Sequence, residues 1–554
     1  MNYPFENLDN FTLPSLLKRS VKLYNDNDLV GKVGEDAMKY HQFNTKVLEM
    51  VKLLQNNGIS KGDKVLLLGE NMPHWGVAYF AVTYFGAVIV PVLPDFHPSD
   101  VHHIIKHSEV KAVFVSDKYL ATVEESEDNN IKFVIKLDDL KIIDELTNQT
   151  YISKLAKRFS HSTKNIEKPN EDDMASLLYT SGTTGHSKGV MLSHKNLVTN
   201  AMSAYTKITI EPNNVFLSIL PLAHTLECTV GFIIPILNGA SIFHINKAPT
   251  PSVLLKAFKI VRPTMMVSVP LIIEKIYKNK ILTQINSSII TRTLYKIPFM
   301  RKQLNLIAGK KLIEIFGGRL SFFGIGGASL SPSVEQFLIE SEFPYIIGYG
   351  LTETAPLIAA SIHQGVKKIG STGLNMAGVK LKIKNMNPTT KTGEIIAKSP
   401  SVMLGYFKDD EKTAEVMEDG WFLTGDLGYI DDDGYLFING RSKNVIIGSG
   451  GENIYPEQIE ANINRYEAVI DSLVMMKDNK LIARIHLDYD IIDKKFGFDN
   501  DKNMGKDITK LLEEMRLEVN SSISSFSRMV KFIEQIEPFV KTPTKKIKRY
   551  LYTE

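Results

Sequence analysis

The sequence has little of what marks an exported or membrane-spanning protein. Its 554 residues include one cysteine, Cys228, which excludes an intramolecular disulfide and suits a reducing compartment. The first residues lack the charged-then-apolar layout of an export signal. The best apolar run, AVIVPVL, is far too short to span a bilayer. We therefore expect a cytoplasmic protein, with peripheral contact at the inner face of a membrane left open.

The sequence also has no large excess of positive or negative charge. The 65 Lys and Arg residues and 62 Asp and Glu residues give a net charge of +3, which is too balanced to indicate nucleic acid as a partner. With 554 residues and 44% hydrophobic content, the chain is long enough to bury more than one core. The composition predicts a globular protein with a large domain and at least one smaller one.

Short apolar runs recur between helical stretches in the first two thirds of the chain. They are KVLLLG, HWGVAYFAVTYFG, AVIVPVL, KAVFVS, SLLYT, VFLSILPL, SIFHI, TMMVSVP and LSFFGIGG. This alternation predicts an α/β fold with parallel strands joined by helices that cover both faces of the sheet. In such sheets the ligand lies beyond the carboxyl ends of the strands.

The pattern changes near Val379 to strand pairs with tight turns, such as the Asp433-Gly434 turn in DDDGYLFING, which predicts antiparallel strands. After Arg441 come a short strand, a helix from Pro456 and further strands and helices. We place a domain boundary at 440–443, which predicts domains 1–440 and 441–554.

The loop that follows SLLYT has no Walker pattern. That pattern needs Gly before its Lys and Ser or Thr after it, whereas Lys188 lies between Ser187 and Gly189. The small and hydroxyl residues of the loop are Ser181, Gly182, Thr183, Thr184 and Gly185. Such residues let backbone N–H groups approach an anion, so the loop indicates either a polyphosphate site or an ordinary flexible turn.

Three further stretches carry candidate chemistry. In IIGYGLTETAP, Tyr349 offers a face for a base, Thr352 a donor and Glu353 an oxygen ligand for Mg²⁺; the alternative is a turn capped by Thr352. In GWFLTGDLGYI, Asp426 is either a ribose acceptor or a turn residue. The tail FVKTPTKKIKRY is either functional or a solvated basic end.

The loop at 180–189, YGLTET, GWFLTGD, GRSKNVIIGSGGENIYPEQIE and KTPTKKIKR occur in this order along nearly the whole chain. Together they closely resemble the adenylate-forming superfamily of acyl-CoA synthetases, adenylation domains and beetle luciferases, most of all the long-chain fatty acyl-CoA synthetases. The resemblance implies a large N-terminal domain of α/β sheets with a small β-barrel-like part, then a small mobile α+β domain. It also implies attack of a carboxylate on the α-phosphate of ATP, followed by displacement of AMP by a thiol.

The resemblance assigns roles to individual residues. Lys546 would supply positive charge during adenylation; the family usually has Gly before this lysine, where this chain has Lys545, and the TPTKKIKR spacing favours Lys546. His224 would lie near the reacting carboxylate. Glu353 and Thr180 would form the Mg²⁺ site. Lys443 would be the hinge. The remaining expected nucleotide and CoA contacts are Ser181, Gly182, Thr183, Thr184, Gly185, Lys188, Gly326, Gly327, Gly348, Tyr349, Thr352, Asp426, Arg441, Gly450 and Gly451.

The expected substrates are ATP with Mg²⁺, a long-chain fatty acid and coenzyme A. The stretches LPLAHTLECTVGFIIPILNG and RPTMMVSVPLIIEKIYKNK resemble those of long-chain enzymes, and the apolar residues from Leu226 to Leu237 suit an alkyl chain or an ordinary core. No carrier segment follows Lys546, so we expect the thiol to come from another molecule. An acyl carrier protein, a medium-chain or aryl acid, a Walker-type ATPase and a non-catalytic binding module remain alternatives.

Residues 276–313 include eight Lys or Arg and no Asp or Glu, interleaved with Ile, Leu, Tyr and Phe. A basic stretch of this kind indicates either peripheral contact with anionic lipid or a solvated basic face on ordinary helices.

Overall fold

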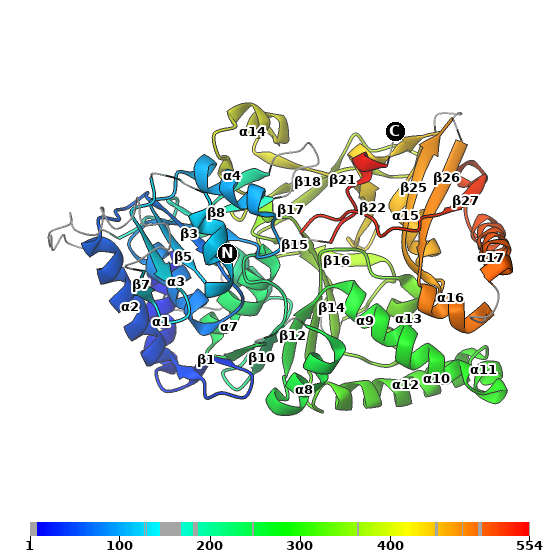
Figure 1. Ribbon diagram of the computed structural model, residues 1–554, viewed down its shortest axis with the longest axis horizontal. Helices are drawn as coiled ribbons and strands as arrows, with labels where there is room; N and C mark the ends of the chain where they lie inside the picture. The colour runs from blue at the N-terminus through cyan, green and yellow to red at the C-terminus, as the bar shows by residue number, and fades with distance from the viewer. Residues whose placement is uncertain are drawn as a thin grey trace.

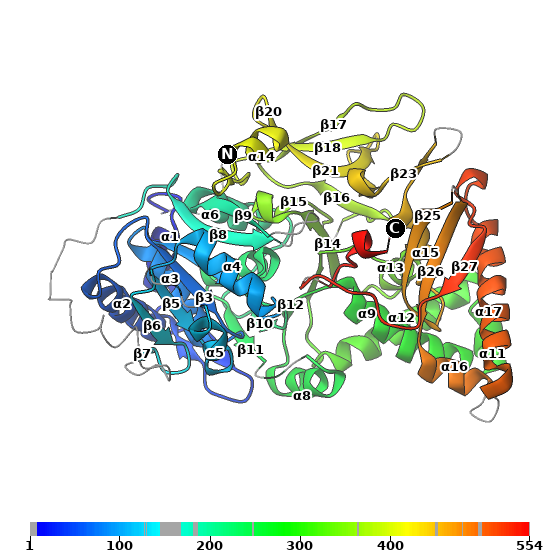
Figure 2. The same cartoon turned by 45° about the horizontal axis from the view of Figure 1, so that its top comes forward.

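The computed structural model describes residues 8–143 except 127 and 129, 168–180, 187–448 except 246, 248, 363 and 364, and 452–552 except 479, 497–500 and 544. Figure 1 shows an elongated molecule in which the first helices and the last helices lie at opposite ends. Two large sheets fill the part between the N-terminal end and the C-terminal elements (Figures 1 and 2).

The first sheet is mostly parallel at its centre. Among the described residues it has eight strands, in spatial order β19 (Gly405–Tyr406), β9 (Lys188–Ser193), β8 (Met174–Thr180), β4 (Val88–Val92), β3 (Lys64–Leu68), β5 (Ala112–Val115), β6 (Phe133–Lys136) and β7 (Lys141–Ile142). Strands β8, β4, β3, β5 and β6 run parallel, whereas β9 and β8 form an antiparallel pair. The candidate phosphate loop joins these two antiparallel strands.

The second sheet has 14 strands among the described residues, with β20 (Met417–Glu418) paired on β21. The spatial order of the others is β17 (Lys380–Lys384), β18 (Gly393–Lys398), β21 (Trp421–Ile430), β22 (Leu436–Arg441), β16 (Ser371–Asn375), β15 (Leu357–Ala360), β14 (Tyr345–Gly350), β13 (Phe322–Ile325), β12 (Met265–Ser268), β10 (Val215–Ser218), β11 (Ser241–His244), β1 (Asp28–Lys32) and β2 (Met38–Lys39). Strands β14, β13, β12 and β10 are parallel neighbours, so their carboxyl ends meet at one edge.

The α/β fold class predicted from the sequence is confirmed, with one difference in the antiparallel part. The strands from β15 to β17 pair in antiparallel fashion, as expected from the tight turns. No described pairing closes these strands into a barrel: they continue the open second sheet, and β17 is its last strand. The expected barrel-like part is therefore an open antiparallel extension.

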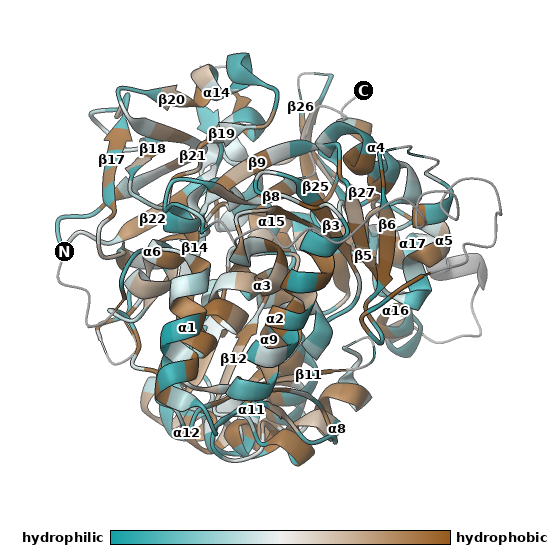
Figure 3. Ribbon diagram, turned by 90° about the vertical axis from the view of Figure 1, so that its left-hand side faces the viewer, coloured by the Kyte–Doolittle hydropathy of each residue, from teal (hydrophilic) through white to brown (hydrophobic). Residues whose placement is uncertain are grey.

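Helices cover both sheets (Figure 3). The helices up to residue 416 are α1 (Leu13–Tyr24), α2 (Tyr40–Asn56), α3 (Pro73–Tyr84), α4 (Pro98–Ser108), α5 (Leu120–Glu124), α6 (His194–Ala204), α7 (Ile234–Asn238), α8 (Pro251–Val261), α9 (Pro270–Ile276), α10 (Thr283–Asn286), α11 (Ile289–Leu294), α12 (Pro298–Ile315), α13 (Pro332–Glu340) and α14 (Asp410–Val416). Within the described part of the chain, no helix combines the length and the apolar character that crossing a bilayer requires.

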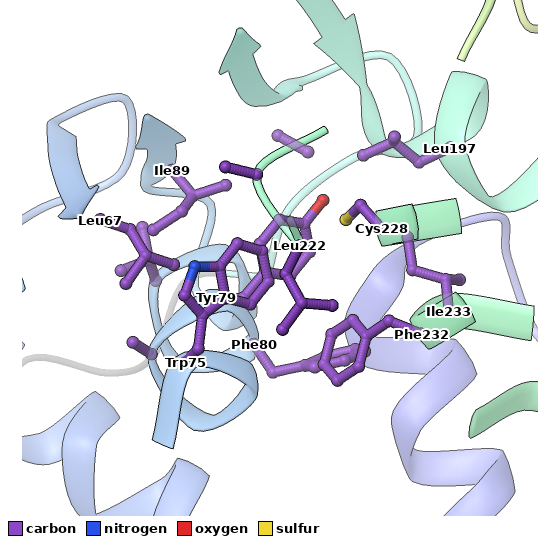
Figure 4. Packing of buried hydrophobic residues seen from close by; sticks show 14 of the residues in the cluster. Leu67, Trp75, Tyr79, Phe80, Ile89, Leu197, Leu222, Cys228, Phe232 and Ile233 are labelled. Atoms are coloured by element: carbon purple, nitrogen blue, oxygen red, sulfur yellow. The ribbon is translucent and has the colours of Figure 1, made fainter. Parts of the chain in front are cut away.

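One apolar run from the sequence forms a helix instead of a strand. HWGVAYFAVTYFG lies mostly in α3, which is buried on nearly all sides. A helix that is apolar all round is typical of a protein interior, and periodicity alone does not separate it from a buried strand. Trp75 of α3 stacks on Tyr79 at 5.3 Å between ring centroids and meets Phe232 edge to face at 5.9 Å (Figure 4). The core between the sheets is centred on this aromatic group.

The residues after 441 have a core of their own. Strands β25 (Val469–Lys477), β26 (Lys480–Leu487) and β27 (Lys531–Glu534) form a three-stranded sheet, and β23 (Ile446–Ile447) pairs with β24 (Asn453–Ile454). Helices α15 (Pro456–Ile463), α16 (Tyr489–Phe496) and α17 (Asp501–Ser521) accompany them. The buried cluster around Ile463, Leu487 and Met515 is separate from the clusters of the two large sheets. This separation suits the predicted boundary at 440–443.

Candidate active site

The edge where the parallel strands of the second sheet end carries several of the predicted residues. His224 follows β10, Gly326 and Gly327 follow β13, and the turn Thr352–Thr354 follows β14. Because these strands are neighbours, segments more than 100 residues apart in sequence meet at one edge.

Tyr349, Asp426 and Arg441 form one hydrogen-bonded group. The Tyr349 hydroxyl donates to Asp426 Oδ2 at 2.6 Å, and Arg441 Nε lies 2.8 Å from Asp426 Oδ1. Asp426 on β21 and Arg441 on β22 are cross-strand partners. Burial raises the pKa of the Asp426 carboxyl, and the Arg441 guanidinium opposes that effect. The group holds a buried carboxylate that can accept hydrogen bonds from a ligand diol.

The turn that carries Glu353 is held by residues that the sequence did not single out. Asn200 of α6 donates from Nδ2 to the carbonyls of Thr354 and Leu357, at 3.1 and 2.8 Å. The Tyr406 hydroxyl donates to Glu353 Oε1 at 2.9 Å. Asn200 and Tyr406 lie far from Glu353 in the sequence and have no motif of their own, so only the fold could reveal them. They fix the direction in which the Glu353 carboxylate points.

Thr180 and Lys188 face each other across the last pair of the β8–β9 ladder. Lys188 Nζ lies 5.3 Å from the centre of the Tyr406 ring, which places it beside the residue that supports Glu353. Burial lowers the pKa of Lys188, and the charges of Lys412 and Lys443 act in the same direction. Five predicted loop residues lie outside the described residues: Ser181, Gly182, Thr183, Thr184 and Gly185.

Lys546 and Lys545 have different surroundings. Lys545 Nζ lies 2.7 Å from Asp95 Oδ2, in a pair whose side chains are both more than half exposed. Lys546 is exposed to solvent, yet nearby protein atoms and the Arg441 charge lower its pKa, while the charges of Asp426 and Glu353 raise it. Of the two lysines, Lys546 is the one that shares the electrostatic environment of the predicted nucleotide contacts.

Both lysines lie in a tight turn. Lys541 bridges Ile547, the Lys545 N–H donates to the Thr542 carbonyl at 2.8 Å, and Lys545 has a φ of 63°. Lys545 therefore occupies the left-handed region of the backbone map, which residues other than Gly seldom adopt. This position suits Gly, which the resembled family usually has there.

His224 lies within electrostatic reach of Lys546. The Leu226 N–H donates to His224 Nδ1 at 3.2 Å, so the neutral ring carries its hydrogen on Nε2. Burial, with a further contribution from the Lys546 charge, lowers the pKa of His224 to about 4. The imidazole is therefore a neutral N–H donor at physiological pH.

Gly348 lines a narrow apolar cavity, and Gly326 lies against Leu226 of its wall. A Cβ on Gly326 would lie 2.9 Å from Leu226 Cδ2, and one on Gly348 would lie 2.9 Å from Leu357 Cδ2, so a side chain at either position would collide with a leucine of the wall. The cavity holds about 40 Å³. Its walls include Leu226, Val230, Ile234, Val267, Phe322 and Ile346, with Lys207 as its charged member. Phe232 and Ile233 of the same segment pack in the core instead (Figure 4).

Two other predictions concern the hinge residue and the glycines that are expected to contact CoA. Lys443 is exposed in the short 3₁₀ turn Ser442–Asn444 that follows β22. Gly450 and Gly451 lie outside the described residues. The roles assigned to all these site residues stay predictions.

The described residues include no group of three or more His, Cys, Asp or Glu side chains that could hold a metal by itself. Glu353 still fits the predicted Mg²⁺ site, because Mg²⁺ is commonly bound by one or two carboxylates together with substrate phosphates. Tyr406 fixes one Glu353 oxygen, and the other remains available as a ligand.

The motifs and the fold agree with comparison to known proteins. A model of the AMP-binding enzyme family matches residues 17–407, and the chain belongs to that family. Among curated proteins it is 28% identical to peroxisomal long chain acyl-CoA synthetase 7 of Arabidopsis thaliana, over 94% of this chain and 80% of that one. It is also 28% identical to the long-chain-fatty-acid–CoA ligase of Bacillus subtilis, over 84% of this chain and 83% of that one. ATP-bound MatB from Rhodopseudomonas palustris has the same fold, with a TM-score of 0.75 and 22% identity over 97% of this chain and 98% of that chain.

Proposed function

We propose that this protein uses ATP to convert a long-chain fatty acid first to acyl-AMP and then to acyl-CoA. In the first step a carboxylate oxygen attacks the α-phosphorus and pyrophosphate leaves. In the second step the CoA thiol attacks the acyl carbon and AMP leaves. The observation that carries the proposal is the hydrogen-bonded group of Tyr349, Asp426 and Arg441, which has Lys546 within electrostatic reach of Asp426, Glu353 and His224.

The residues present suit the electrostatic demand of adenylation. A carboxylate is a poor electrophile, and its attack on a phosphate crowds negative charge, so the transition state needs preorganised positive charge. In this proposal Lys546 supplies that charge, and Lys188 and Thr352 hold phosphate oxygens. Tyr349 offers its ring to adenine, and Asp426 and Arg441 contact the ribose. When bound, Mg²⁺ on Glu353 would screen the phosphates.

The apolar cavity supports an alkyl substituent on the acid. Strands β13 and β14 line it with Phe322, Gly324, Ile346 and Gly348. Each buried CH₂ contributes about 0.8 kcal/mol, so chain-length preference should be graded. The curated relatives named as long-chain acyl-CoA synthetases support the same substrate class.

A product assay tests the proposed function. The protein is incubated with ATP, Mg²⁺ and acids of graded chain length, without thiol, with CoA, or with acyl carrier protein, and the nucleotide and thioester are identified. We expect AMP and a CoA thioester, with the highest rates for long-chain acids. AMP with only the carrier thioester would favour an acyl-carrier-protein ligase, and a maximum with medium-chain or aryl acids would change the substrate class. ADP, or no product, would overturn the proposal.

We also propose that the basic stretch at 276–313 contacts the cytoplasmic face of a membrane, where the fatty acid is collected. Helix α11 and its flanks project at one end of the molecule (Figure 1). Ile289, Ile290 and Phe299 there are 78%, 71% and 69% exposed. Arg292, Lys296 and Lys302 beside them are exposed and have no acidic partner among the described residues. Apolar side chains interleaved with cations suit an anionic lipid surface.

Replacement of Ile289 by serine is expected to lower binding to vesicles that contain anionic lipid by about tenfold, because a fully buried Ile contributes about 1.5–3 kcal/mol. The measurement is co-sedimentation with phosphatidylserine-containing vesicles, with phosphatidylcholine vesicles as the zwitterionic comparison. Val366→Ser is the matched control, since Val366 is 70% exposed on another surface. Equal binding by both variants and the unmodified protein would exclude this contact.

A further inference from the structure

One lysine of the basic stretch points away from solvent and onto the C-terminal part of the chain. Lys278 lies in the π-helical turn Tyr277–Leu282, between α9 and α10. Its ammonium donates to the carbonyl of Tyr466 at 2.7 Å and to that of Val469 at 3.2 Å. Both acceptors belong to the segment where α15 has ended and β25 begins. Figure 1 shows the α9–α10 row alongside the C-terminal elements, as these bonds require.

The surroundings of Lys278 favour this contact. Burial lowers the pKa of Lys278, whereas Glu467, Asp488 and Glu274 raise it. Two of these carboxylates, Glu467 and Asp488, come from the C-terminal part. A half-buried cation that donates to two carbonyls beside acidic groups makes charge-assisted hydrogen bonds, which are about twice as strong as neutral ones.

The Lys545–Asp95 pair also joins the two parts of the chain, but it is weaker. Its side chains are 69% and 51% exposed, so solvent screens their attraction. Lys278 therefore contributes more than this pair to holding the C-terminal part against the helices of residues 270–315. In the same arrangement Lys546 lies within electrostatic reach of Asp426 and Glu353.

We propose that Lys278 is a positioning residue that latches the C-terminal part in the orientation used for adenylation. The inference rests on the proposed two-step function, in which the C-terminal part turns about Lys443 before the thiol attacks. Because Tyr466 and Val469 lie beyond that pivot, a turn of the C-terminal part carries their carbonyls away and breaks both hydrogen bonds. Lys278 thereby favours the first half-reaction over the second without touching a substrate.

The kinetic test compares Lys278→Met, which keeps the length of the side chain and removes its charge, with Lys280→Met. Lys280 is exposed in the same turn and has no ion pair among the described residues. Adenylation is followed by pyrophosphate release without CoA, and thioester formation is followed from supplied acyl-adenylate and CoA. We expect Lys278→Met to slow adenylation about tenfold, as loss of hydrogen bonds from a charged group implies, with thioester formation unchanged or faster. Lys278→Arg should restore most of the adenylation rate.

Equal slowing of both half-reactions by Lys278→Met, or no effect on either, would overturn the latch. If that variant fails to fold, Lys278→Gln takes its place in the same comparison. If the unmodified protein forms no acyl-adenylate from any acid, the failure belongs to the proposed function.

A second measurement reports the orientation of the C-terminal part directly and does not depend on enzymatic activity. Cysteines placed at Asp95 and Lys545, which touch in this arrangement, can be joined by a short bis-maleimide. Adding Lys278→Met is expected to lower the cross-linking yield severalfold, whereas adding Lys280→Met should leave it unchanged. An unchanged yield with Lys278→Met would also overturn the latch.

Discussion

Replacement of Lys546 by alanine is expected to slow acyl-adenylate formation by a factor of about 10²–10³, the usual cost of removing one preorganised group that stabilises developing charge. Thioester formation from supplied acyl-adenylate should stay close to that of the unmodified protein, because its leaving group is already in place. The measurement is pyrophosphate release for the first step and thioester formation for the second. The selective loss follows from the charge of Lys546, which lies within electrostatic reach of Glu353 and Asp426.

Lys545→Ala is the matched control for that experiment. Its ammonium pairs with Asp95 at an exposed position, so its removal should change either step by less than about threefold. Equal losses in both half-reactions of Lys546→Ala would show that another group supplies the charge. A large adenylation defect in Lys545→Ala instead would assign the role to the neighbouring lysine.

Replacement of Lys443 by proline is expected to lower overall turnover by more than about tenfold while leaving a single round of adenylation largely intact. Proline fixes φ near about −65°, which the short turn Ser442–Asn444 tolerates, but it prevents the torsional change that a hinge needs. The protein would be held in the pose with Lys546 in the site. A burst of pyrophosphate without continued thioester release is the expected signature.

Comparison with Lys443→Ala distinguishes an effect on backbone rotation at the hinge from an effect of losing the lysine side chain. The Lys443 side chain is exposed, so alanine should leave turnover nearly unchanged. Normal turnover by Lys443→Pro would place the pivot elsewhere, and equal defects in both variants would indicate a contact made by the ammonium.

Sequence patterns were sufficient to predict the fold class, because buried parallel strands have nearly continuous apolar runs. They failed at α3, where a run that is apolar on every side has no periodicity to distinguish helix from strand. The tight turns correctly predicted antiparallel strands, but the barrel-like part that the family resemblance implied is an open sheet from β15 to β17. Strand pairing across long sequence distances leaves no local signal that could have shown this.

The residues of the candidate site fall into two groups: those that sequence motifs identify and those that only the fold identifies. Glu353, Asp426 and Arg441 belong to motifs, so the sequence alone is enough to propose them. Asn200 and Tyr406, which hold the Glu353 turn, have no local pattern and contact it across more than 50 residues of sequence. The sequence groups Lys278 with the other cations of the basic stretch, but its two bonds to main-chain carbonyls show that it faces the C-terminal part.

The segment that begins at His224 has a consequence for how acids of the wrong size are rejected. In the proposed reaction His224 would stand near the reacting carboxylate, while Leu226, Val230 and Ile234 of the same short segment line the cavity. An acyl chain that fits this cavity wall poorly therefore strains the backbone of the segment, and with it the orientation of the His224 imidazole. Poorly matched acids should still bind, but they should be activated slowly, so that discrimination between chain lengths is found in the turnover rate more than in affinity.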